Sequence, residues 1–216
     1  VFMMDPIPNR MSLNSRMEER FTARLIRLAD IPRVNALLAV LFTEVVFSTE
    51  NCKRLIEDPS KVPILIEAND TLAGILIFTA GIEGSLENVG YITTLGVAKE
   101  FRRRGLGRSL LYLSSLLGIY HFHVKTLALH VNMENIPAID LYSKVGFEQR
   151  GIVEDFYGIS HNGLYMNCNA SIVYEKIKDS NQIEMERDVI NLLHAMKSPE
   201  YFIPLRGTDD FINDIL

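Results

Sequence analysis

Three consecutive arginines stand beside two glycines where the sequence pattern changes from strand to helix. The segment Leu95–Leu111 reads LGVAKEFRRRGLGRSLL, with Arg102–Arg104 directly before Gly105 and close to Gly107. The first backbone N–H groups of a helix have no internal partner, and the positive end of the helix dipole lies there. A basic cluster is unfavourable at that end unless an anion compensates it, and glycine lets a ligand approach the backbone closely. The pattern therefore favours an anion-binding site over a cluster that only improves solubility.

The composition indicates an acidic globular protein in which this basic cluster is local. The chain has 216 residues, 48% of them hydrophobic, and a formal net charge of -5. That charge argues against general nucleic-acid binding, and no apolar run reaches the length of about 18 residues that a membrane-spanning helix needs. Cys52 and Cys168 form no CxxC pair, so we expect buried, reduced thiols, with a disulfide between them as the alternative. His121 and His123 have no identifiable third ligand, so we expect no metal site.

Hydrophobic periodicity predicts an order of strands and helices that is typical of an α/β protein. Apolar runs predict strands at 21–29, 62–68, 71–83, 88–98, 125–132, 147–157 and 163–176. Helical spacing predicts helices at 30–42, 48–58, 104–122 and 135–147. Antiparallel strands are thus followed by a strand–helix–strand–helix–strand unit. We therefore expect a mixed central sheet with helices on both faces.

Cap and turn residues predict where several of these elements begin and end. Asp30 is expected to cap the helix that follows it, and Asn69-Asp70 to form a hairpin turn. Gly146 is expected to end the helix at 135–147.

Alternation along two strands predicts which side chains share a face. One face of the strand at 88–98 is expected to carry Tyr91, Thr93, Leu95 and Val97. In the strand at 125–132, one face carries Leu127, Leu129 and Val131, and the other carries Ala128 and His130.

The two ends of the chain differ from its centre. Residues 1–20 lack periodicity and an apolar signal-peptide core, so we expect a flexible arm that is not a secretory signal. The domain is expected at 21–178, and 179–216 is expected to be an acidic helical extension. From Asn181 onward, seven acidic residues stand against three Lys or Arg.

A helical stripe in this extension could pack in three ways. The apolar residues at helical spacing are Val189, Leu192, Leu193 and Met196. They fit packing on the domain, packing on a second subunit in a homodimer, or peripheral contact with a membrane. Interfacial helices usually carry Lys and Arg, so the acidic charge favours packing on protein over membrane contact.

Two motifs in order resemble the GCN5-related N-acetyltransferase (GNAT) family. Arg102–Gly107 fits the signature R/Q-x-x-G-x-G/A, in which backbone amides of that family hold the pyrophosphate of acetyl-CoA. The later stretch HVNMENIPAIDLYSKVGF resembles the family's N-x-x-A-x-x-x-Y-x-x-x-G-F signature. The resemblance covers about Phe21 to Tyr174 and implies a GNAT fold with acetyl-CoA as cofactor. Within the family, the sequence is similar to protein N-terminal acetyltransferases of the Golgi-associated NatF type, and next to the NatE catalytic subunit.

The resemblance implies a catalytic pair, Tyr91 and His130. An α-ammonium group has a pKa near ~8, so it must lose a proton before its nitrogen attacks a thioester. That step needs a general base, acting directly or through water. Histidine has a suitable pKa range, and a tyrosine hydroxyl can position the water or share the proton relay.

The resemblance also implies the cofactor-binding residues. The backbone at Leu95–Val97 is expected to align the pantetheine, with the Val97 amide polarising the acetyl carbonyl. For Tyr142, protonation of the leaving thiolate and simple packing remain open alternatives. The implied set is Leu95, Gly96, Val97, Arg102, Arg103, Arg104, Gly105, Leu106, Gly107, Arg108, Asn135, Tyr142, Ser143 and Lys144.

For the peptide substrate, the resemblance implies Phe42, Thr93 and Tyr157. Phe42 is retained from a Phe-Pro loop of the relatives, but Thr43 stands where they have proline. Phe156 replaces a second tyrosine beside Tyr157. The preference for an N-terminal methionine is therefore the least constrained part of the prediction.

These motifs predict an acetyl-CoA-dependent N-terminal acetyltransferase that uses direct transfer in a ternary complex, with protein N-termini as substrates. One alternative keeps the fold and cofactor but acts on a lysine side chain or a small amine. The other is a non-catalytic acyl-CoA-binding module. The expected location is the cytoplasm, with the cytosolic face of a Golgi-type membrane as the alternative.

Overall fold

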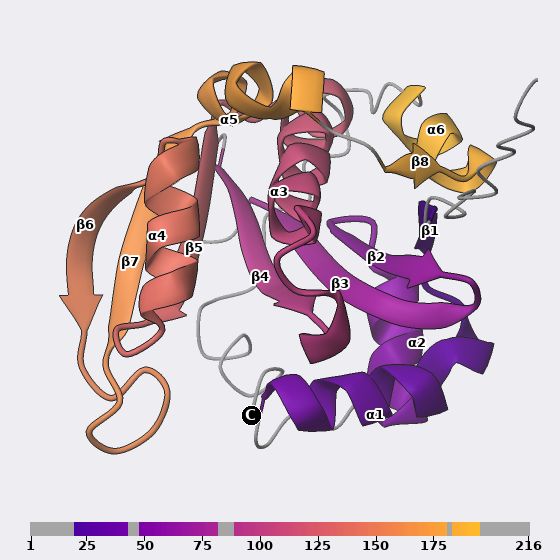
Figure 1. Ribbon diagram of the computed structural model, residues 1–216, viewed down its shortest axis with the longest axis horizontal. Helices are drawn as coiled ribbons and strands as arrows, with labels where there is room; N and C mark the ends of the chain where they lie inside the picture. The colour runs from indigo at the N-terminus through magenta and orange to yellow at the C-terminus, as the bar shows by residue number, and fades with distance from the viewer. Residues whose placement is uncertain (1–19, 43–47, 82–88, 181–182, 195–216) are drawn as a thin grey trace, which may run out of the picture.

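The computed structural model describes residues 20–42, 48–81, 89–180 and 183–194. Within these ranges, one mixed sheet runs in the order β6-β7-β5-β4-β3-β2-β1-β8, with helices on both faces (Figure 1). The strands are β1 Phe21–Leu25, β2 Lys61–Ala68, β3 Thr71–Ala80, β4 Val89–Val97, β5 Thr126–Asn132, β6 Glu148–Val153, β7 Gly163–Asn169 and β8 Glu184–Met185. The α-helices are α1 Ile31–Leu41, α2 Thr49–Glu57, α3 Leu106–Leu116, α4 Ile136–Val145, α5 Ala170–Ile177 and α6 Arg187–His194. The expected α/β fold class is confirmed.

The antiparallel half of the sheet, β1 to β4, is built on the predicted hairpin. Asn69 and Asp70 have φ values of 47° and 63° and join β2 to β3. A two-residue turn with both residues in the left-handed region matches the twist of the flanking strands. The hairpin prediction is confirmed, and it sets the register in which β3 presents its residues to β4.

A buried ionic network ties β1 to β2 and to the start of α1. The Arg24 side chain is 5% exposed and donates to Asp30 at 2.7 Å and to Glu67 at 2.8 Å. Asp30 does precede α1, but its carboxylate accepts from Arg24 and from the Arg27 N–H rather than from the helix. The predicted side-chain cap is therefore wrong, because a buried guanidinium competes more strongly for that carboxylate.

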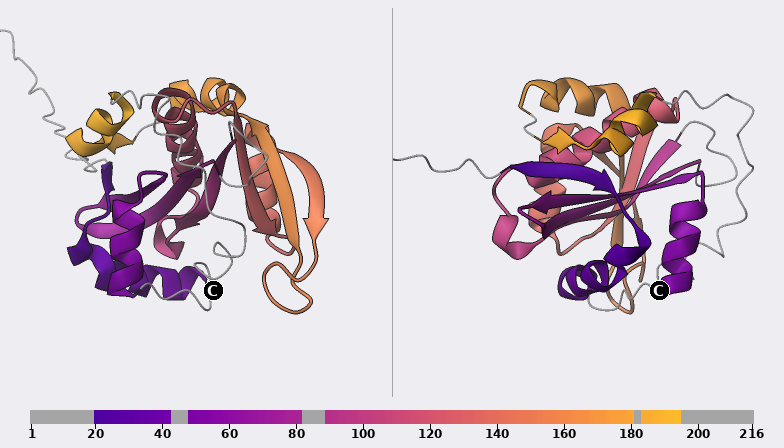
Figure 2. Two further views of the ribbon diagram at one scale, coloured as in Figure 1. Left: turned by 180° about the vertical axis from the view of Figure 1, so that it is seen from behind. Right: turned by 90° about the vertical axis from the view of Figure 1, so that its right-hand side faces the viewer.

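Two hydrophobic cores lie on opposite faces of the sheet (Figures 1 and 2). The α3-side core packs under α3, α4 and α5 and includes Leu110, Leu113 and Leu117. The α1-side core packs under α1 and α2 and includes Leu38 and Leu65. Strand β4 pairs in parallel with β5 through the α3 crossover, and both strands contribute residues to the α3-side core.

Strand β4 contains an irregularity that the alternation could not show. Ile92 and Thr94 pair with consecutive residues of β3, so Thr93 is one extra residue, a β-bulge. A bulge shifts every later side chain to the other face. Tyr91 accordingly faces away from the α3-side core, whereas Leu95 packs against it. The single shared face predicted for Tyr91, Thr93, Leu95 and Val97 is wrong.

Strand β5 has the predicted faces. Leu127, Leu129 and Val131 lie in the α3-side core, and Ala128 packs with Tyr91 on the other face. Alternation holds here because β5 is paired without a register shift with β7.

Other boundaries also differ from the prediction, among them that of the strand expected at 147–157, which covers only Glu148–Val153 and is followed by a turn. The strand expected at 163–176 ends at Asn169, whose side chain caps α5 by accepting from the Ser171 N–H. Buried Ala170, Val173 and Ile177 follow helical spacing, so tertiary packing outweighs the β-branched residues there. The strand expected at 21–29 ends at Leu25, because Leu28–Asp30 form a 3-10 turn.

The described part of the C-terminal segment packs on the rest of the protein. β8 pairs in parallel with β1, and α6 lies beside them (Figure 1). Ile183 and Val189 belong to the α3-side core, and Val189 is fully buried. Met196 lies outside the described residues.

Candidate active site

The candidate site lies where β4 and β5 separate. These parallel strands pair only from Val89↔Thr126 to Tyr91↔Ala128, after which they diverge (Figure 1). Beyond Tyr91, the backbone N–H and C=O groups on the edge of β4 that faces β5 take no part in the pairing with β5. Such an edge can bind an extended ligand that contains amide groups.

Tyr91 and His130 meet at this point of divergence. Tyr91 is paired with Ala128, and His130 lies two residues further along the same face of β5. The Tyr91 hydroxyl forms a hydrogen bond with His130 Nδ1. The structure therefore brings together the two residues that the sequence predicted as a catalytic pair.

Aromatic rings surround His130. The Phe156 ring stacks on the imidazole with a centroid distance of 4.1 Å and an angle of 15° between the planes. The Tyr165 ring lies 5.1 Å away. Burial lowers the pKa of His130 to about 4, so the imidazole is neutral at pH 7. A neutral imidazole can accept a proton, as a general base must.

The arginine-glycine segment forms the turn into α3. Gly105 has a φ of 85°, and no side chain caps α3. The helical hydrogen bonds begin when the Ser109 N–H donates to the Gly105 carbonyl. The first-turn N–H groups, including those of Leu106 and Gly107, therefore stand outside the α3 ladder. This is the arrangement that binds anions at helix N-termini.

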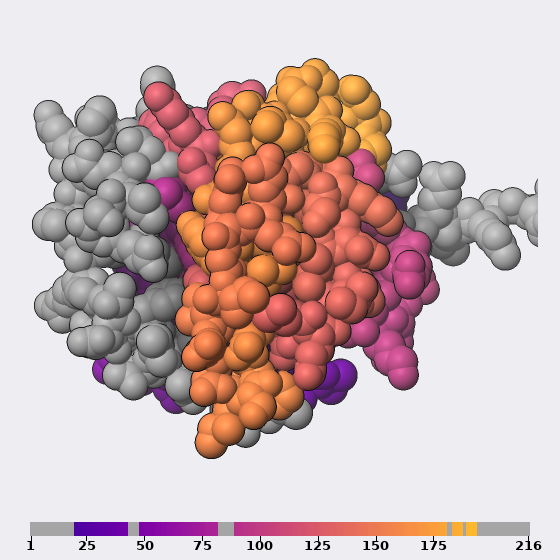
Figure 3. All heavy atoms as spheres, turned by 90° about the vertical axis from the view of Figure 1, so that its left-hand side faces the viewer, coloured from indigo at the N-terminus to yellow at the C-terminus, as the bar shows by residue number. Residues whose placement is uncertain are grey.

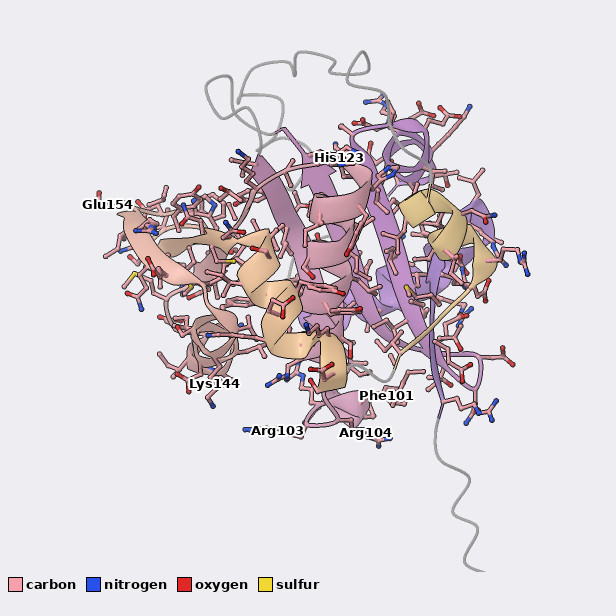
Figure 4. All side chains as sticks on the ribbon, turned by 90° about the horizontal axis from the view of Figure 1, so that it is seen from above. Phe101, Arg103, Arg104, His123, Lys144 and Glu154 are labelled. Carbon is pink, nitrogen blue, oxygen red and sulfur yellow. The ribbon has the colours of Figure 1, made fainter. Side chains whose placement is uncertain are left out.

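The arginines beside this turn differ in what they contact. Arg102 donates to the Val97 carbonyl at 3.1 Å, and Arg104 donates to the Glu100 carbonyl at 3.0 Å and lies over the Phe101 ring. Arg103 and Arg104 project from the turn in Figure 4. Their guanidinium groups place positive charge near the N-terminus of α3.

Arg108 is engaged elsewhere. Its side chain donates to the Lys176 carbonyl at 3.1 Å, at the end of α5, where a cation is favourable. Arg108 is therefore available to an anion mainly through its backbone N–H. Lys176 in turn donates to the Lys144 carbonyl at 3.3 Å. Lys144 lies at the same edge of the molecule as Arg103 (Figure 4).

The glycines in this region also permit close packing. A Cβ at Gly107 would come within 2.8 Å of Leu141 of α4, and a Cβ at Gly96 within 2.5 Å of Leu41 of α1. Both glycines let a helix approach segments that the sequence predicts to bind the cofactor. Leu95 and Val97, on either side of Gly96, pack against the α3-side core.

The second motif forms α4 as predicted. Asn135 caps it by accepting from the Ala138 N–H, and Gly146 ends it with a φ of 110°. Burial raises the pKa of Tyr142 to about 12, and its ring packs beside Phe147. Packing is thus observed for Tyr142, and thiolate protonation stays a prediction. Ser143 is exposed in the last turn of α4.

The predicted substrate residues occupy three separate elements. Phe42 ends α1 and packs against the α1-side core, whereas the following Thr43 lies outside the described residues. Thr93 is the bulged residue of β4, and its hydroxyl donates to the Ile77 carbonyl at 2.9 Å. Tyr157 lies beside Phe156, and burial raises the pKa of Tyr157 although 42% of the residue is exposed.

Two residues at the site were missed. Tyr165 is placed against His130 by the pairing of β7 with β5, which no local pattern indicates. Thr79 is directly opposite Tyr91 on β3 and is 1% exposed. Its hydroxyl has no hydrogen-bond partner among the described residues. A buried hydroxyl of this kind is unusual and needs an explanation such as a bound water.

The described ranges also bear on the metal, membrane and disulfide alternatives. They contain no group of three or more His, Cys, Asp or Glu side chains that could hold a metal ion. Every helix in them is too short or too polar to cross a bilayer. Cys52 and Cys168 are free and buried, which overturns the disulfide alternative, and burial raises the pKa of both thiols.

A family model decides the family. The model described as "Acetyltransferase (GNAT) family" matches residues 32–147, which is more than half of the chain. The chain belongs to the GNAT acetyltransferase family. Its members use acetyl-CoA as the acetyl donor, and the match includes the α3 turn, both strands of the candidate site and α4.

Relatives within this GNAT family include N-terminal acetyltransferases. The chain is 28% identical over 82 residues to an N-alpha-acetyltransferase of Sulfurisphaera tokodaii, covering 38% of this chain and 49% of that protein. It is 35% identical over 88 residues to N-alpha-acetyltransferase 60 of Xenopus tropicalis, covering 40% of this chain and 36% of that protein. The chain thus spans half or less of the length of these two relatives.

A solved GNAT structure has the same fold. The structure of Arabidopsis thaliana NAA60 in complex with a bisubstrate analogue matches with a TM-score of 0.60. The match covers 69% of this chain and 98% of that chain at 19% identity. At this identity the likeness shows the fold alone.

Proposed function

We propose that this GNAT protein is an N-terminal protein acetyltransferase, which transfers an acetyl group from acetyl-CoA to the free α-amine of proteins that begin with methionine. The observation that carries the proposal is the contact between the Tyr91 hydroxyl and His130 Nδ1 where β4 and β5 diverge. The relatives named N-alpha-acetyltransferase support this acceptor.

The residues of the α3 turn and of β4 fit acetyl-CoA. The left-handed Gly105 and the uncapped start of α3 leave backbone N–H groups for a pyrophosphate, beside the exposed Arg103. The free edge of β4 fits the amides of pantetheine. When bound, acetyl-CoA would supply a thioester: the amine nitrogen bonds to its carbonyl carbon, the C–S bond breaks, and CoA leaves as the thiol once its sulfur has taken up a proton.

His130 and Tyr91 handle the proton of the acceptor amine. A substrate α-ammonium has a pKa near ~8, so at pH 7 it must lose a proton before attack. The neutral imidazole accepts that proton before the nitrogen forms its new bond, and the Tyr91 hydroxyl holds the imidazole and extends the relay. Both groups act on a substrate amine held in the same complex as the cofactor, so the acetyl group is transferred directly, without an acetylated enzyme intermediate.

The acceptor side of the site is proposed to consist of Phe42, Thr93 and Tyr157. Phe42 provides an apolar wall at the end of α1, in keeping with a methionine side chain. The Thr93 backbone, displaced by the bulge, is available to a peptide. Tyr157 provides an aromatic wall from the turn between β6 and β7.

A peptide assay tests this proposal. The purified protein is mixed with acetyl-CoA and free-amine peptides that begin with Met-Leu, Met-Lys, Met-Val, Ser or Ala, and CoA release is followed. We expect turnover on the Met peptides, with mass spectrometry placing the acetyl group on the first amine.

Two matched peptides separate the alternatives. One has a blocked N-terminus and an internal lysine, and the other has a free Met N-terminus and arginine in place of that lysine. Acetylation of only the second peptide supports the proposal. Acetylation of only the first, or of a polyamine, would assign another acceptor, and cofactor binding without any turnover would indicate a binding module.

A further inference from the structure

The aromatic stack on His130 comes from a segment outside both family motifs. Phe156 lies in the turn between β6 and β7, which projects at one end of the molecule (Figure 3), and its ring is nearly parallel to the imidazole at 4.1 Å. A nearly parallel stack at this distance is a specific arrangement, because aromatic pairs can adopt many geometries, from offset-parallel to edge-on. The turn therefore presents one particular ring to the base.

Local hydrogen bonds give this turn a defined shape. The Asp155 N–H donates to Asn162 Oδ1 at 3.0 Å, and the Ser160 N–H donates to Asp155 Oδ1 at 2.6 Å. The Tyr157 N–H donates to the His161 carbonyl at 2.9 Å. These bonds close the turn on both sides of Phe156 and limit the positions that its ring can take.

Gly163 makes room for Phe156 at the start of β7. A Cβ at position 163 would lie 2.8 Å from Phe156 Cβ and 2.9 Å from its Cγ. Those distances are too short for real contacts, so a larger residue would displace Phe156. Gly163 does not have a positive φ, and its substitution would act through this displacement rather than through backbone strain.

The groups around the imidazole come from three elements. Tyr91 of β4 holds Nδ1, Tyr165 of β7 lies beside the ring, and Phe156 covers one of its faces. Tyr157, which follows Phe156 in the turn, packs on the Phe156 ring, and the turn also contains Glu154, Asp155 and His161. Burial is the cause of the low His130 pKa, and no charged side chain in the described residues contributes to it.

We propose that Phe156 is a positioning residue, which holds the His130 imidazole against the Tyr91 hydroxyl and shields it from water. The inference rests on the proposed function, since it assigns Phe156 a role in the same reaction. The turn 154–162 and Gly163 thus act on the base from outside the strands that carry it. Removing the ring would let the imidazole rotate away and take up a proton at a higher pH.

Three variants test this role. Phe156→Ala removes the ring, Phe156→Tyr keeps it, and Gly163→Ala displaces it without altering any residue that touches His130. For Phe156→Ala we expect kcat to fall at least about tenfold, because small misplacements of a catalytic group are costly. KM for acetyl-CoA should stay within about twofold. Gly163→Ala should also lower kcat. The kcat of Phe156→Tyr should stay near that of the unmodified protein.

A pH titration provides a readout that a merely structural role would not move. The His130 signal is followed by NMR in the unmodified protein and in Phe156→Ala, and is assigned by its loss in His130→Asn. We expect the His130 pKa to rise from about 4 toward the ordinary value near ~6.5. This measurement needs no substrate, so it tests the inference even if no peptide is acetylated.

Several results would overturn the inference. An unchanged His130 titration in Phe156→Ala would show that the ring does not shield the base. Equal loss of kcat in Phe156→Tyr and Phe156→Ala would show that something other than the stack matters. Should Phe156→Ala fail to fold by circular dichroism, Phe156→Leu replaces it, and an unaltered kcat and titration in that variant would equally contradict the role.

Discussion

At the scale of single residues, the site depends on a histidine that stays neutral. His130 is an unusual base because its pKa of about 4 lies far below the pKa near ~8 of the amine it serves. The His130 imidazole is therefore neutral, and able to accept a proton, at every pH above about 5. The ionisation that limits the reaction near neutrality is therefore that of the substrate amine.

The pH dependence of turnover follows from this difference. The rate at subsaturating peptide should rise from pH 6 to pH 8 with the fraction of free amine, with no separate inflection near 6.5 from His130. Replacing the α-amine by one of lower pKa should shift the whole profile to lower pH. A fixed inflection near 6.5 for both amines would contradict the burial of His130.

His130→Ala should lower kcat by about 10²- to 10⁴-fold, the usual contribution of a positioned general base. Acetyl-CoA affinity should be largely kept, because the α3 turn is untouched. Steady-state kinetics and isothermal titration with acetyl-CoA check the two parts. Full turnover in this variant would assign the base elsewhere.

Gly105→Asp should weaken acetyl-CoA binding. The carboxylate would repel a pyrophosphate at the start of α3, at a residue with a φ of 85°. Gly105→Asn is the matched control, since asparagine has nearly the size of aspartate and the same tolerance of the left-handed region without the charge. We expect a clearly larger loss of affinity for the aspartate than for the asparagine, measured by titration calorimetry, and equal losses would remove the electrostatic reason.

At the scale of elements, the Arg24 network joins β1, β2 and α1. Its guanidinium lowers the pKa of Asp30 and of Glu67, mainly through hydrogen bonds to their side chains. A carboxylate with a lowered folded-state pKa contributes stability above its unfolded-state pKa of about 4. That contribution is lost as the pH falls through the folded-state values, so the protein should lose stability below pH 4.

Arg24→Ala should lower the free energy of unfolding by roughly 3–5 kcal/mol at pH 7, because it leaves two buried carboxylates without their partner. Arg33→Ala is the control, since the Arg33 side chain is exposed and contacts the same Glu67. An exposed ion pair contributes about 0–1 kcal/mol. Urea unfolding at pH 7 and pH 3 measures the free energy of unfolding of the two variants. A similar loss of stability in Arg24→Ala and Arg33→Ala would contradict the burial argument.

At the scale of the whole molecule, the C-terminal segment is part of the fold that carries the site. Val189 is fully buried in the α3-side core, while its neighbour Ile190 is 39% exposed. We propose that the domain at 21–178 is stabilised by the first part of the extension at 179–216. Contact with a membrane stays a proposal for the remainder of that extension.

Val189→Asp tests this arrangement, because burying a carboxylate without a partner is strongly unfavourable. We expect a loss of at least about 2 kcal/mol in thermal or urea unfolding. Ile190→Asp should change stability by no more than about 0.5 kcal/mol, as an exposed site. Comparable losses for both variants, or none for either, would show that α6 is not anchored through Val189.

The amino-acid sequence by itself determined the local elements and the local chemistry. The turn of the candidate anion site could be predicted because strand, glycine turn and helix follow one another directly in the chain. The hairpin at Asn69-Asp70, the end of α4 at Gly146 and the faces of β5 depended in the same way on neighbouring residues.

Only the tertiary structure decided what surrounds the base. The Thr93 bulge arises from the pairing of β4 with β3, and Tyr165 reaches His130 through the pairing of β7 with β5. The stack of Phe156 on His130 needs a turn 26 residues further along the chain to fold back and Gly163 to leave space for it. Contacts between distant segments depend on register and packing, which no local pattern encodes, and these contacts bury the proposed base, which lowers its pKa.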